Sequence, residues 1–565
     1  MAEGLLQNKY LEACNVLGEK LGWKPRPGVL KVLGRLDELL DRGEEGVVLM
    51  EYPAGYGKST MTLTLAKAAV DGNPFFLRVI HVLPMRTIVD DLGQRLRCWM
   101  EILGYRSSFV GVQHMGSPGS PFFAKKCVVV TLDTFLLNFY KAPAYELAKL
   151  FKYDVSHYEF PRGNIYSSIV VFDEFHLLSP QSAGELSSLE DEARALCSAT
   201  RAIIQMACVG VPVVVMTATM PKTLKEFLKE HVEESGLRFE EESYSPSDDK
   251  EFEERRRKKM LKLVKLDGNS LKGILEEVAE CHRRGKRVMV VLNTVKAAVD
   301  AYGELKAAGL SPVLLHGRLP ELLKRERSEA IKKTRVLVAT QVVEAGIDES
   351  FDVLVSEVCP PDRLLQRMGR VARREGHDEG EVVVVARVSK GVYDQRVVDE
   401  TWKLLGEHSD FRSRSEVEDE VRTVMDKVYS EGFADELRRY FKVFEQSLGY
   451  LDAYPFITSS DARDFIEHVG KITPSFGIVP LFAAEDVKSG VYLQNPVALS
   501  EKMAKNALKQ GANLVKDGKI VVPSDRERKG FISAENLSLE LLKKGYDGLV
   551  VDKIDREVGY VGVED

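Results

Sequence analysis

Residues 52–60 have the composition of a phosphate-binding loop. The segment Tyr52-Pro53-Ala54-Gly55-Tyr56-Gly57-Lys58-Ser59-Thr60 follows an apolar run, 46–50, and precedes a helical pattern, 61–70. Glycines let backbone N–H groups approach phosphate oxygens, the lysine supplies a cation to the β and γ phosphates, and the serine hydroxyl suits Mg²⁺. The sequence therefore predicts that residues 54–60 bind a nucleoside triphosphate and that Ser59 is a metal ligand.

A pair of acidic residues ends a second apolar run. Asp173 and Glu174 come directly after residues 169–172, Ile-Val-Val-Phe. An unpaired carboxylate pair at the end of a buried strand is costly unless it has a function. We expect Asp173 to hold magnesium, largely through water, and Glu174 to polarise an attacking water. His176 either links this site to Thr217-Ala218-Thr219 or is a capped core histidine, and we favour the link.

Phosphoryl transfer to water also needs a cation on the developing charge. The segment Gln366-Arg367-Met368-Gly369-Arg370-Val371-Ala372-Arg373 offers one. Arg370 and Arg373 are three residues apart, which places them on one face if the segment is helical. They are predicted to reach the γ phosphate as arginine fingers, with Gln366 as a further catalytic residue.

The pattern of strands and helices that must position these residues is that of an α/β protein with doubly wound parallel sheets. Apolar runs that end in small polar or charged residues recur, as parallel sheets require. The first set lies at 77–83, 127–130, 168–172 and 211–216, and the second at 287–292, 312–315, 335–339 and 381–385. Two similar cores in tandem are therefore expected, and only the first has a phosphate loop.

The expected domain order follows from these patterns. An N-terminal helical segment, 1–41, precedes the first core, 42–235, and a charged, solvated linker, 236–260, leads to the second core, 261–390. A helical connector, 391–450, follows. The accessory domain, 451–565, mixes short strands with a helix at 495–510 that begins on an Asn-Pro signal.

Composition excludes several classes of protein. The chain has 565 residues, a net charge of −7 and an isoelectric point near 6.0. Any contact with nucleic acid must therefore come from a local basic groove. The seven cysteines form no Cys-x-x-Cys pair, which argues against a disulfide framework or a zinc site. No signal peptide or membrane-spanning run is present, so a cytoplasmic protein with no membrane partner is expected.

Taken together, the motifs resemble those of superfamily-two DExD/H-box helicases. They comprise Pro53–Ser59, the Asp-Glu-Phe-His and Thr-Ala-Thr segments, Val338-Ala339-Thr340-Gln341-Val342-Val343-Glu344-Ala345-Gly346-Ile347-Asp348, and residues 366–373. Residues 83–89, Leu-Pro-Met-Arg-Thr-Ile-Val, and Thr131-Leu132-Asp133-Thr134 further resemble the helicase of type I CRISPR interference. The fold implied is two RecA-like domains.

The resemblance implies a motor that hydrolyses ATP, with magnesium, to move 3′ to 5′ on the DNA single strand displaced by a guide-RNA surveillance complex, the non-target strand of an R-loop. Gly346 and Asp348 are expected to meet the nucleotide from the second core. Non-sequence-specific strand contacts are expected from the loops facing away from the nucleotide; for Thr and Asn, ordinary helix capping is equally open. These residues are Arg86, Thr87, Thr131, Thr134, Asn293, Thr294, His316, Arg318 and Thr340.

Two features depart from the family pattern. Gly28-Val29 stands where the family has an adenine-reading glutamine, so adenine selectivity stays open. The family's HD nuclease domain is not found: the only His-Asp dipeptide, His377-Asp378, lies in a Gly- and Glu-rich loop. A separate nuclease subunit is therefore expected. The alternatives are a superfamily-two helicase of DNA repair or RNA remodelling, and an ATP-gated clamp or adaptor of the interference complex that does not unwind.

Overall fold

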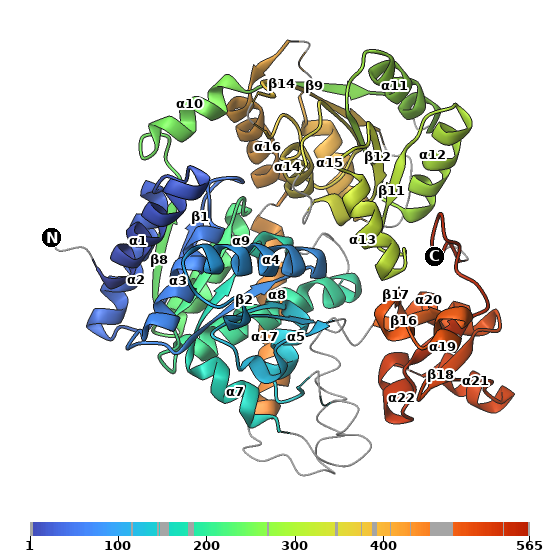
Figure 1. Ribbon diagram of the computed structural model, residues 1–565, viewed down its shortest axis with the longest axis horizontal. Helices are drawn as coiled ribbons and strands as arrows, with labels where there is room; N and C mark the ends of the chain where they lie inside the picture. The colour runs from blue at the N-terminus through green and yellow to red at the C-terminus, as the bar shows by residue number, and fades with distance from the viewer. Residues whose placement is uncertain are drawn as a thin grey trace. The chain divides into compact units, whose positions relative to one another are not determined.

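The described part of the chain forms two compact α/β units. The computed structural model describes residues 4–114, 117–143, 146, 157–178, 186–267, 271–344, 349–374, 376–386, 393–406, 408, 410–429, 431–452, 478–534 and 536–562. The first unit takes the residues within 1–147, 155–255 and 429–473, and the second those within 148–154, 256–428 and 474–565 (Figure 1). The predicted fold class is confirmed, since the large sheet of each unit is mostly parallel.

The sheet of the first unit has the order β4-β3-β5-β2-β6-β7-β1-β8. All neighbours pair in parallel except β3 and β4. Most strands are short β-branched runs buried on both faces, as expected of parallel strands covered by helices. The strands are β1 (Gly46–Glu51), β2 (Arg78–Leu83), β3 (Val110–His114), β4 (Ser117–Pro118), β5 (Cys127–Thr131), β6 (Ser168–Phe172), β7 (Val213–Thr217) and β8 (Arg238–Ser243).

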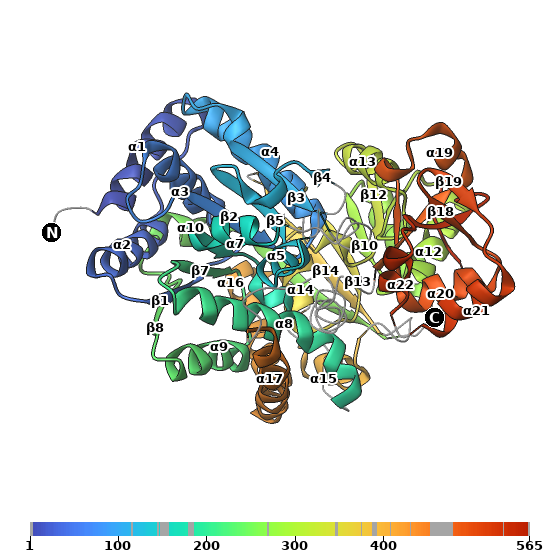
Figure 2. The same cartoon turned by 90° about the horizontal axis from the view of Figure 1, so that it is seen from below.

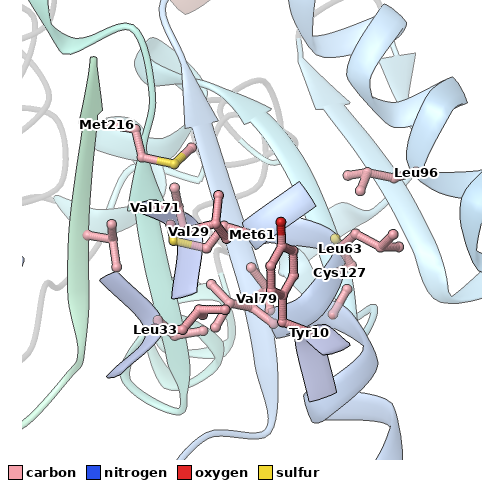
Figure 3. Close-up of a cluster of buried hydrophobic side chains, with 14 of the residues drawn as sticks. Tyr10, Val29, Leu33, Met61, Leu63, Val79, Leu96, Cys127, Val171 and Met216 are labelled. Atoms are coloured by element: carbon pink, nitrogen blue, oxygen red, sulfur yellow. The ribbon is translucent and has the colours of Figure 1, made fainter. Parts of the chain in front are cut away.

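Helices cover both faces of this sheet. On one face α1 (Leu5–Leu21), α2 (Pro27–Arg42), α3 (Ser59–Asp71) and α4 (Arg86–Ile102) enclose a core that contains Tyr10, Leu33, Met61, Val79 and Val171 (Figure 3). The remaining helices of the unit are α5 (Leu132–Phe139), α7 (Glu159–Tyr166), α8 (Leu186–Ala207), α9 (Lys222–Glu234) and α17 (Glu431–Asp452). Of these, α17 packs against α8 and α9 (Figure 2).

The second unit repeats the plan with the strand order β11-β12-β10-β13-β14-β9-β15. Its strands are β9 (Met260–Leu266), β10 (Val288–Val291), β11 (Val313–Leu315), β12 (Val336–Ala339), β13 (Val353–Glu357), β14 (Glu379–Val385) and β15 (Arg412–Ser413). One face packs on α11 (Leu271–Arg283) and α12 (Val295–Ala307). The other helices here are α13 (Glu321–Ala330), α14 (Pro361–Met368), α15 (Gln395–Leu404) and α16 (Arg414–Val428).

A smaller sheet of order β17-β16-β20-β18-β19 also belongs to the second unit. It comprises β16 (Ile478–Ala483), β17 (Val497–Ser500), β18 (Asn513–Lys516), β19 (Lys519–Val521) and β20 (Gly548–Val551), with α19 (Ala484–Ser489), α20 (Glu501–Lys509), α21 (Asp525–Ser533) and α22 (Leu537–Lys543). The expected helix at 495–510 begins six residues late. The cap is Ser500, whose Oγ accepts from the Met503 N–H, while Val497–Ser500 pair with β16.

Two segments differ from the expected domain order. Residues 236–260 are not only a solvated linker, because β8 pairs in parallel with β1 along six residues, and α10 (Lys250–Lys258) follows. The segment 391–450 is not one connector: α15 and α16 belong to the second unit, whereas α17 belongs to the first. The chain thus crosses between the units after Arg255 and again after Val428.

Candidate nucleotide and nucleic-acid site

The phosphate loop lies between the end of β1 and the start of α3. Gly55 and Gly57 have φ angles of 80° and 97°, a left-handed backbone that glycine adopts without a Cβ clash. Lys58 is only 8% exposed, and its Nζ donates to the backbone oxygen of Tyr52 at 2.9 Å. Since the cation lies inside the loop and α3 begins at Ser59, the segment has the parts that a phosphate cradle requires.

The beginning of α2 braces this loop. The Gly28 N–H donates to Tyr56 Oη at 2.9 Å, and a Cβ at position 28 would lie 2.0 Å from a ring carbon of Tyr52. The Tyr56 side chain is fully buried, so only its backbone is left to face a phosphate. Val29, at the position considered for an adenine-reading glutamine, is also buried in the core.

Asp173 lies at the same sheet edge as the phosphate loop. It follows β6, and only β7 separates β6 from β1 in the sheet, so the carboxyl ends of these parallel strands meet there. Burial acts to raise the pKa of Asp173, but the neighbouring His81 and Lys58 outweigh it and lower that pKa below its usual value. The residue is therefore an ionised carboxylate, the form that binds a divalent cation.

His81 is a buried partner of Asp173 that the sequence analysis missed. Its Nε2 lies 3.3 Å from Asp173 Oδ2, and its Nδ1 lies 2.8 Å from Thr62 Oγ1 on α3. Because Thr62 follows the phosphate loop, His81 joins that loop's helix to the acidic site. The sequence did contain a signal for this role, since His81 is a polar residue in the middle of the mostly apolar strand β2.

Glu174 and His176 connect the acidic site to β7. Glu174 has a φ of 53°, a strained conformation for a residue with a Cβ, of the kind that costs about 1–3 kcal/mol and clusters at functional sites. His176 is fully buried, and its Nδ1 lies 2.9 Å from Thr217 Oγ1 and 3.5 Å from Glu174 Oε2. Thr217 Oγ1 in turn donates to the backbone oxygen of Thr219. The structure thus contains the favoured link from His176 to Thr217-Ala218-Thr219.

Arg370 and Arg373 do not share a helix face, contrary to the prediction. Helix α14 ends at Met368, and Phe351 pairs with Val371 in an isolated parallel bridge. That long-range pairing draws the chain out of the helix and into a loop. Within it, Arg370 Nη2 donates to the backbone oxygen of Glu344 at 2.8 Å.

Arg367 is the fully buried arginine of the same segment, and it was not assigned a role from sequence. Its guanidinium pairs with Glu344 at 2.9 Å and donates to Asn293 Oδ1 at 3.1 Å and Ser356 Oγ at 2.9 Å. Removing one partner of a buried ion pair costs about 3–5 kcal/mol. Arg367 therefore connects the ends of β10, β13 and α14 through its side-chain hydrogen bonds. The neighbouring Gln366, a predicted catalytic residue, is 8% exposed.

The predicted strand contacts of the first unit lie after β2 and β5. Arg86 is the first residue of α4; the side chain of Thr87 lies outside the described part of the chain. Thr131 and Thr134 are 4% and 1% exposed, and the Thr131 hydroxyl donates to that of Thr134 at 3.0 Å. These two hydroxyls serve a local hydrogen bond at the start of α5.

The predicted contacts at the ends of β10 and β12 are also engaged locally. Asn293 is 6% exposed, and its Nδ2 donates to the backbone oxygen of Val358. Thr294 caps α12 by accepting from the Ala297 N–H, and Thr340 is 3% exposed. Gly346 and Asp348 lie outside the described residues.

The loop after β11 is fixed by the C-terminal segment of the chain. His316 is fully buried; its Nδ1 accepts from the Arg318 N–H, and its Nε2 lies 3.1 Å from the backbone oxygen of Val558. The Tyr560 N–H donates to the backbone oxygen of Arg318. Burial lowers the pKa of His316 to about 4, so the ring is neutral at pH 7 and shapes the loop.

Comparisons with known proteins agree with this arrangement. Residues 36–227 match the DEAD/DEAH box helicase family, and residues 284–376 match the family described as CRISPR-associated nuclease/helicase Cas3, C-terminal. The CRISPR-associated helicase Cas3 of Thermoproteus tenax is 26% identical over 472 residues, which cover 79% of this chain and 74% of that protein. A putative CRISPR-associated nuclease/helicase Cas3 of Methanocaldococcus jannaschii is 26% identical over 55% of this chain and 40% of that protein.

Solved structures share the fold. The crystal structure of a CRISPR-associated protein has a TM-score of 0.60 and 17% identity, covering 96% of this chain and 70% of that one. T. fusca Cas3 with AMPPNP has a TM-score of 0.53 and 19% identity, covering 84% and 62%. The chain thus spans less than two thirds of some of the proteins it matches.

The chain thus has two RecA-like domains, with a phosphate loop and an Asp-Glu pair at the carboxyl edge of the first sheet, and its first domain matches the DEAD/DEAH box helicase family. The chain is similar to CRISPR-associated Cas3 helicases, and its second domain matches the family model of the Cas3 C-terminal region. Among the described residues, no helix is long and apolar enough to cross a membrane.

Proposed function

We propose that the chain is an ATP-dependent 3′–5′ translocase and helicase that acts on single-stranded DNA in type I CRISPR interference. The observation that carries this proposal is the joining of the phosphate loop, Asp173, His176 and Thr217 at one sheet edge in a chain with Cas3-like domains. The T. fusca relative crystallises with AMPPNP, an ATP analogue, which supports ATP as the nucleotide here.

The residues present fit ATP and magnesium. When bound, magnesium would supply positive charge that offsets the negative charge developing during phosphoryl transfer. Ser59 and the ionised Asp173 would hold it, and Lys58 would turn from Tyr52 to the phosphates. Glu174 would orient and polarise the attacking water. His176 contacts both Glu174 and Thr217, so it would connect Thr217 to this step.

The second domain completes the proposed reaction. Arg370 and Arg373 would supply the cations, and Gly346 and Asp348 would contact the nucleotide. Such arginines accelerate phosphoryl transfer by about 10³–10⁵-fold because they stabilise the negative charge that develops in the transition state. Alternating closure and opening of the two domains would convert hydrolysis into steps along DNA.

The proposed DNA partner is the non-target strand of an R-loop, delivered by a guide-RNA surveillance complex. Arg86 follows β2 and Arg318 follows β11, so each would supply a cation to the DNA backbone. Because contacts to phosphates carry no sequence information, binding would not depend on base sequence. We propose that a separate HD nuclease subunit cuts the strand. In the sequence's only His-Asp dipeptide, His377 Nδ1 lies 3.2 Å from Ser350 Oγ.

Steady-state ATP hydrolysis tests the proposal. The purified chain is assayed alone and with single-stranded DNA, duplex DNA or single-stranded RNA, with Glu174→Gln as the blank. Strong stimulation by single-stranded DNA alone is expected, and Glu174→Gln should bind ATP without turnover. Normal turnover in that variant would contradict the assignment of Glu174 as the residue that polarises the attacking water.

The other outcomes identify the alternatives. Stimulation by RNA instead would indicate a remodelling helicase, and hydrolysis without displacement of a labelled strand would indicate a clamp. Duplexes with 3′ or 5′ single-stranded tails test direction, since a 3′–5′ motor unwinds only the 3′-tailed duplex.

A further inference from the structure

The loop that carries the proposed arginine fingers is held by two cations from distant parts of the chain. We define the finger loop as residues 369–374. Arg414 Nη2 donates to the backbone oxygen of Met368 at 2.8 Å, and its Nη1 donates to that of Val371 at 3.0 Å. Lys259 Nζ donates to the backbone oxygens of Ala372, Arg373 and Arg374.

These contacts place cations against backbone oxygens at and beyond the end of α14, where the Met368 oxygen also accepts from the Val371 N–H at 3.0 Å. Met368 is the last residue of α14, and cations are favourable where helix carbonyls are exposed. Ala372 is fully buried and has a φ of 46°, which a residue with a Cβ keeps only when its surroundings enforce it. The two cations are therefore suited to hold the finger loop in one conformation.

A largely buried carboxylate, Glu418, fixes Arg414 in turn. Arg414 is 7% exposed, and its Nε donates to Glu418 Oε1 at 2.7 Å, while Arg256 Nη2 donates to Glu418 Oε2 at 2.7 Å. Burial acts to raise the pKa of Glu418, but Arg414 and Arg256 outweigh it and lower that pKa to about 2. The group Arg256–Glu418–Arg414 is thus a fully ionised chain of charge-assisted hydrogen bonds.

The group Arg256–Glu418–Arg414 lies beside two of the places where the chain passes between the units. Arg256 is the first residue after the crossing that follows Arg255, and Lys259 comes three residues later. Arg414 opens α16, whose last residue, Val428, precedes the second crossing. Helix α16 packs against α14, at whose C-terminal end the finger loop begins (Figure 1).

We infer that Arg414, with Lys259 and Glu418, positions the finger loop for ATP hydrolysis, so that the connections between the units set how Arg370 and Arg373 are presented. This inference rests on the proposed function. All three are positioning residues: Arg414 and Lys259 contact the loop's backbone, Glu418 holds Arg414, and none of them contacts a reacting atom.

Arg414→Met tests the inference because methionine keeps the length and apolar stem of the side chain but loses its donors. We expect kcat for ATP to fall about tenfold with KM for ATP unchanged, since the phosphate loop is untouched. Hydrogen exchange at the amides of residues 370–374 should accelerate. Arg412→Met is the matched control: it lies two residues away, is 43% exposed and pairs with Glu420.

Two further measurements separate positioning from plain destabilisation. In an Arg370→Ala/Arg373→Ala background, Arg414→Met should lower kcat less than twofold, because the fingers through which it acts are gone. Arg414→Lys should recover part of kcat. A full tenfold loss in that background, or unchanged kcat and amide exchange in Arg414→Met, would overturn the inference.

The design also distinguishes this inference from the proposed function. If Arg370→Ala leaves hydrolysis unchanged, the arginine-finger assignment fails, while amide exchange still reports whether Arg414 holds the loop. If Arg414→Met does not fold, Lys259→Met is the second variant, with the same expected fall in kcat and faster exchange at residues 372–374.

Discussion

The Nδ1 atom of His176 lies 2.9 Å from the Oγ1 atom of Thr217, and both side chains are fully buried. His176 follows the acidic pair by two residues, whereas Thr217 ends the strand between the acidic pair and the phosphate loop. The hydrogen bond therefore joins the predicted water-activating segment to Thr217-Ala218-Thr219 across the sheet edge.

Thr217→Val should lower kcat for ATP hydrolysis about tenfold with little change in ATP affinity, because valine keeps the shape but removes the hydroxyl that His176 contacts. His176→Ala should have a similar effect, and the double variant should be no worse than either single variant if the two act as one unit. Thr200→Val is the control, since it deletes a buried hydroxyl of α8 that has no hydrogen-bond partner among the described residues. Additive losses in the double variant would contradict the coupling.

His81→Leu should weaken the magnesium dependence of nucleotide binding, because Asp173 loses the ring 3.3 Å from its carboxylate. We expect the half-saturating magnesium concentration to rise about tenfold, measured by titration of a fluorescent ATP analogue. Glutamine places an amide near the former Nε2 and should restore most of the affinity, whereas asparagine, which mimics Nδ1, should not. Equal magnesium dependence in all three variants would exclude this role.

The contact between His316 and the C-terminal segment should open in acid. Burial lowers the pKa of His316 to about 4, and Lys324, Arg318 and Arg327 add to this effect. The neutral ring therefore contributes its full stability above the unfolded pKa of about 6.5, and that stability is lost as pH falls toward 4. Hydrogen exchange at residues 557–560, corrected for intrinsic rates, should be faster at pH 5 than at pH 7.5.

His316→Asn is the variant for this test. It keeps an acceptor for the Arg318 N–H but loses the group that faces Val558. Exchange at residues 557–560 should be fast at both pH values, so the pH difference should vanish, whereas His282→Asn on α11 should preserve it. A persistent pH difference in His316→Asn would assign the effect to another group.

Asp133 should make the first unit less stable at neutral pH than in mild acid. Burial raises the pKa of Asp133 to about 6, although Arg86 opposes the shift. The folded state thus holds the proton where the unfolded state has lost it, and this contribution to stability disappears as pH rises from about 4 to 6. Asp133→Asn should raise the melting temperature at pH 7.5 and flatten its pH dependence between 4 and 6. Glu45→Gln, an exposed residue of the same unit, should leave that profile unchanged.

The phosphate loop and the acidic pair were predictable because their geometry is local. Glycines at 55 and 57 permit the left-handed backbone, and the loop joins a strand directly to a helix, so spacing alone places Lys58 and Ser59. Asp173 follows a short β-branched run that is typical of a buried strand, and parallel strands bring their carboxyl ends to one edge. The fold class followed from the same repeating pattern.

The sequence did not predict strands β8 and β13 or the ends of several helices, and these were seen only in the tertiary structure. β8 is rich in charged residues, a composition that indicates a linker, and it is a strand because it pairs with the edge of β1. Residues 495–500 carry a helix signal but pair with β16 instead. In both places a partner distant in sequence outweighs local propensity.

The sequence by itself determined the fold class and the nucleotide loop and predicted the residues able to do chemistry, because each depends on residue types at short spacing. Only the tertiary structure decided how the arginines are presented. Helix α14 stops before Arg370 because Phe351, Lys259 and Arg414 meet the following segment, and those residues lie between 19 and 111 positions away from Arg370 in the chain. Buried partners such as His81 for Asp173 are likewise set by sheet order, which spacing along the chain does not encode.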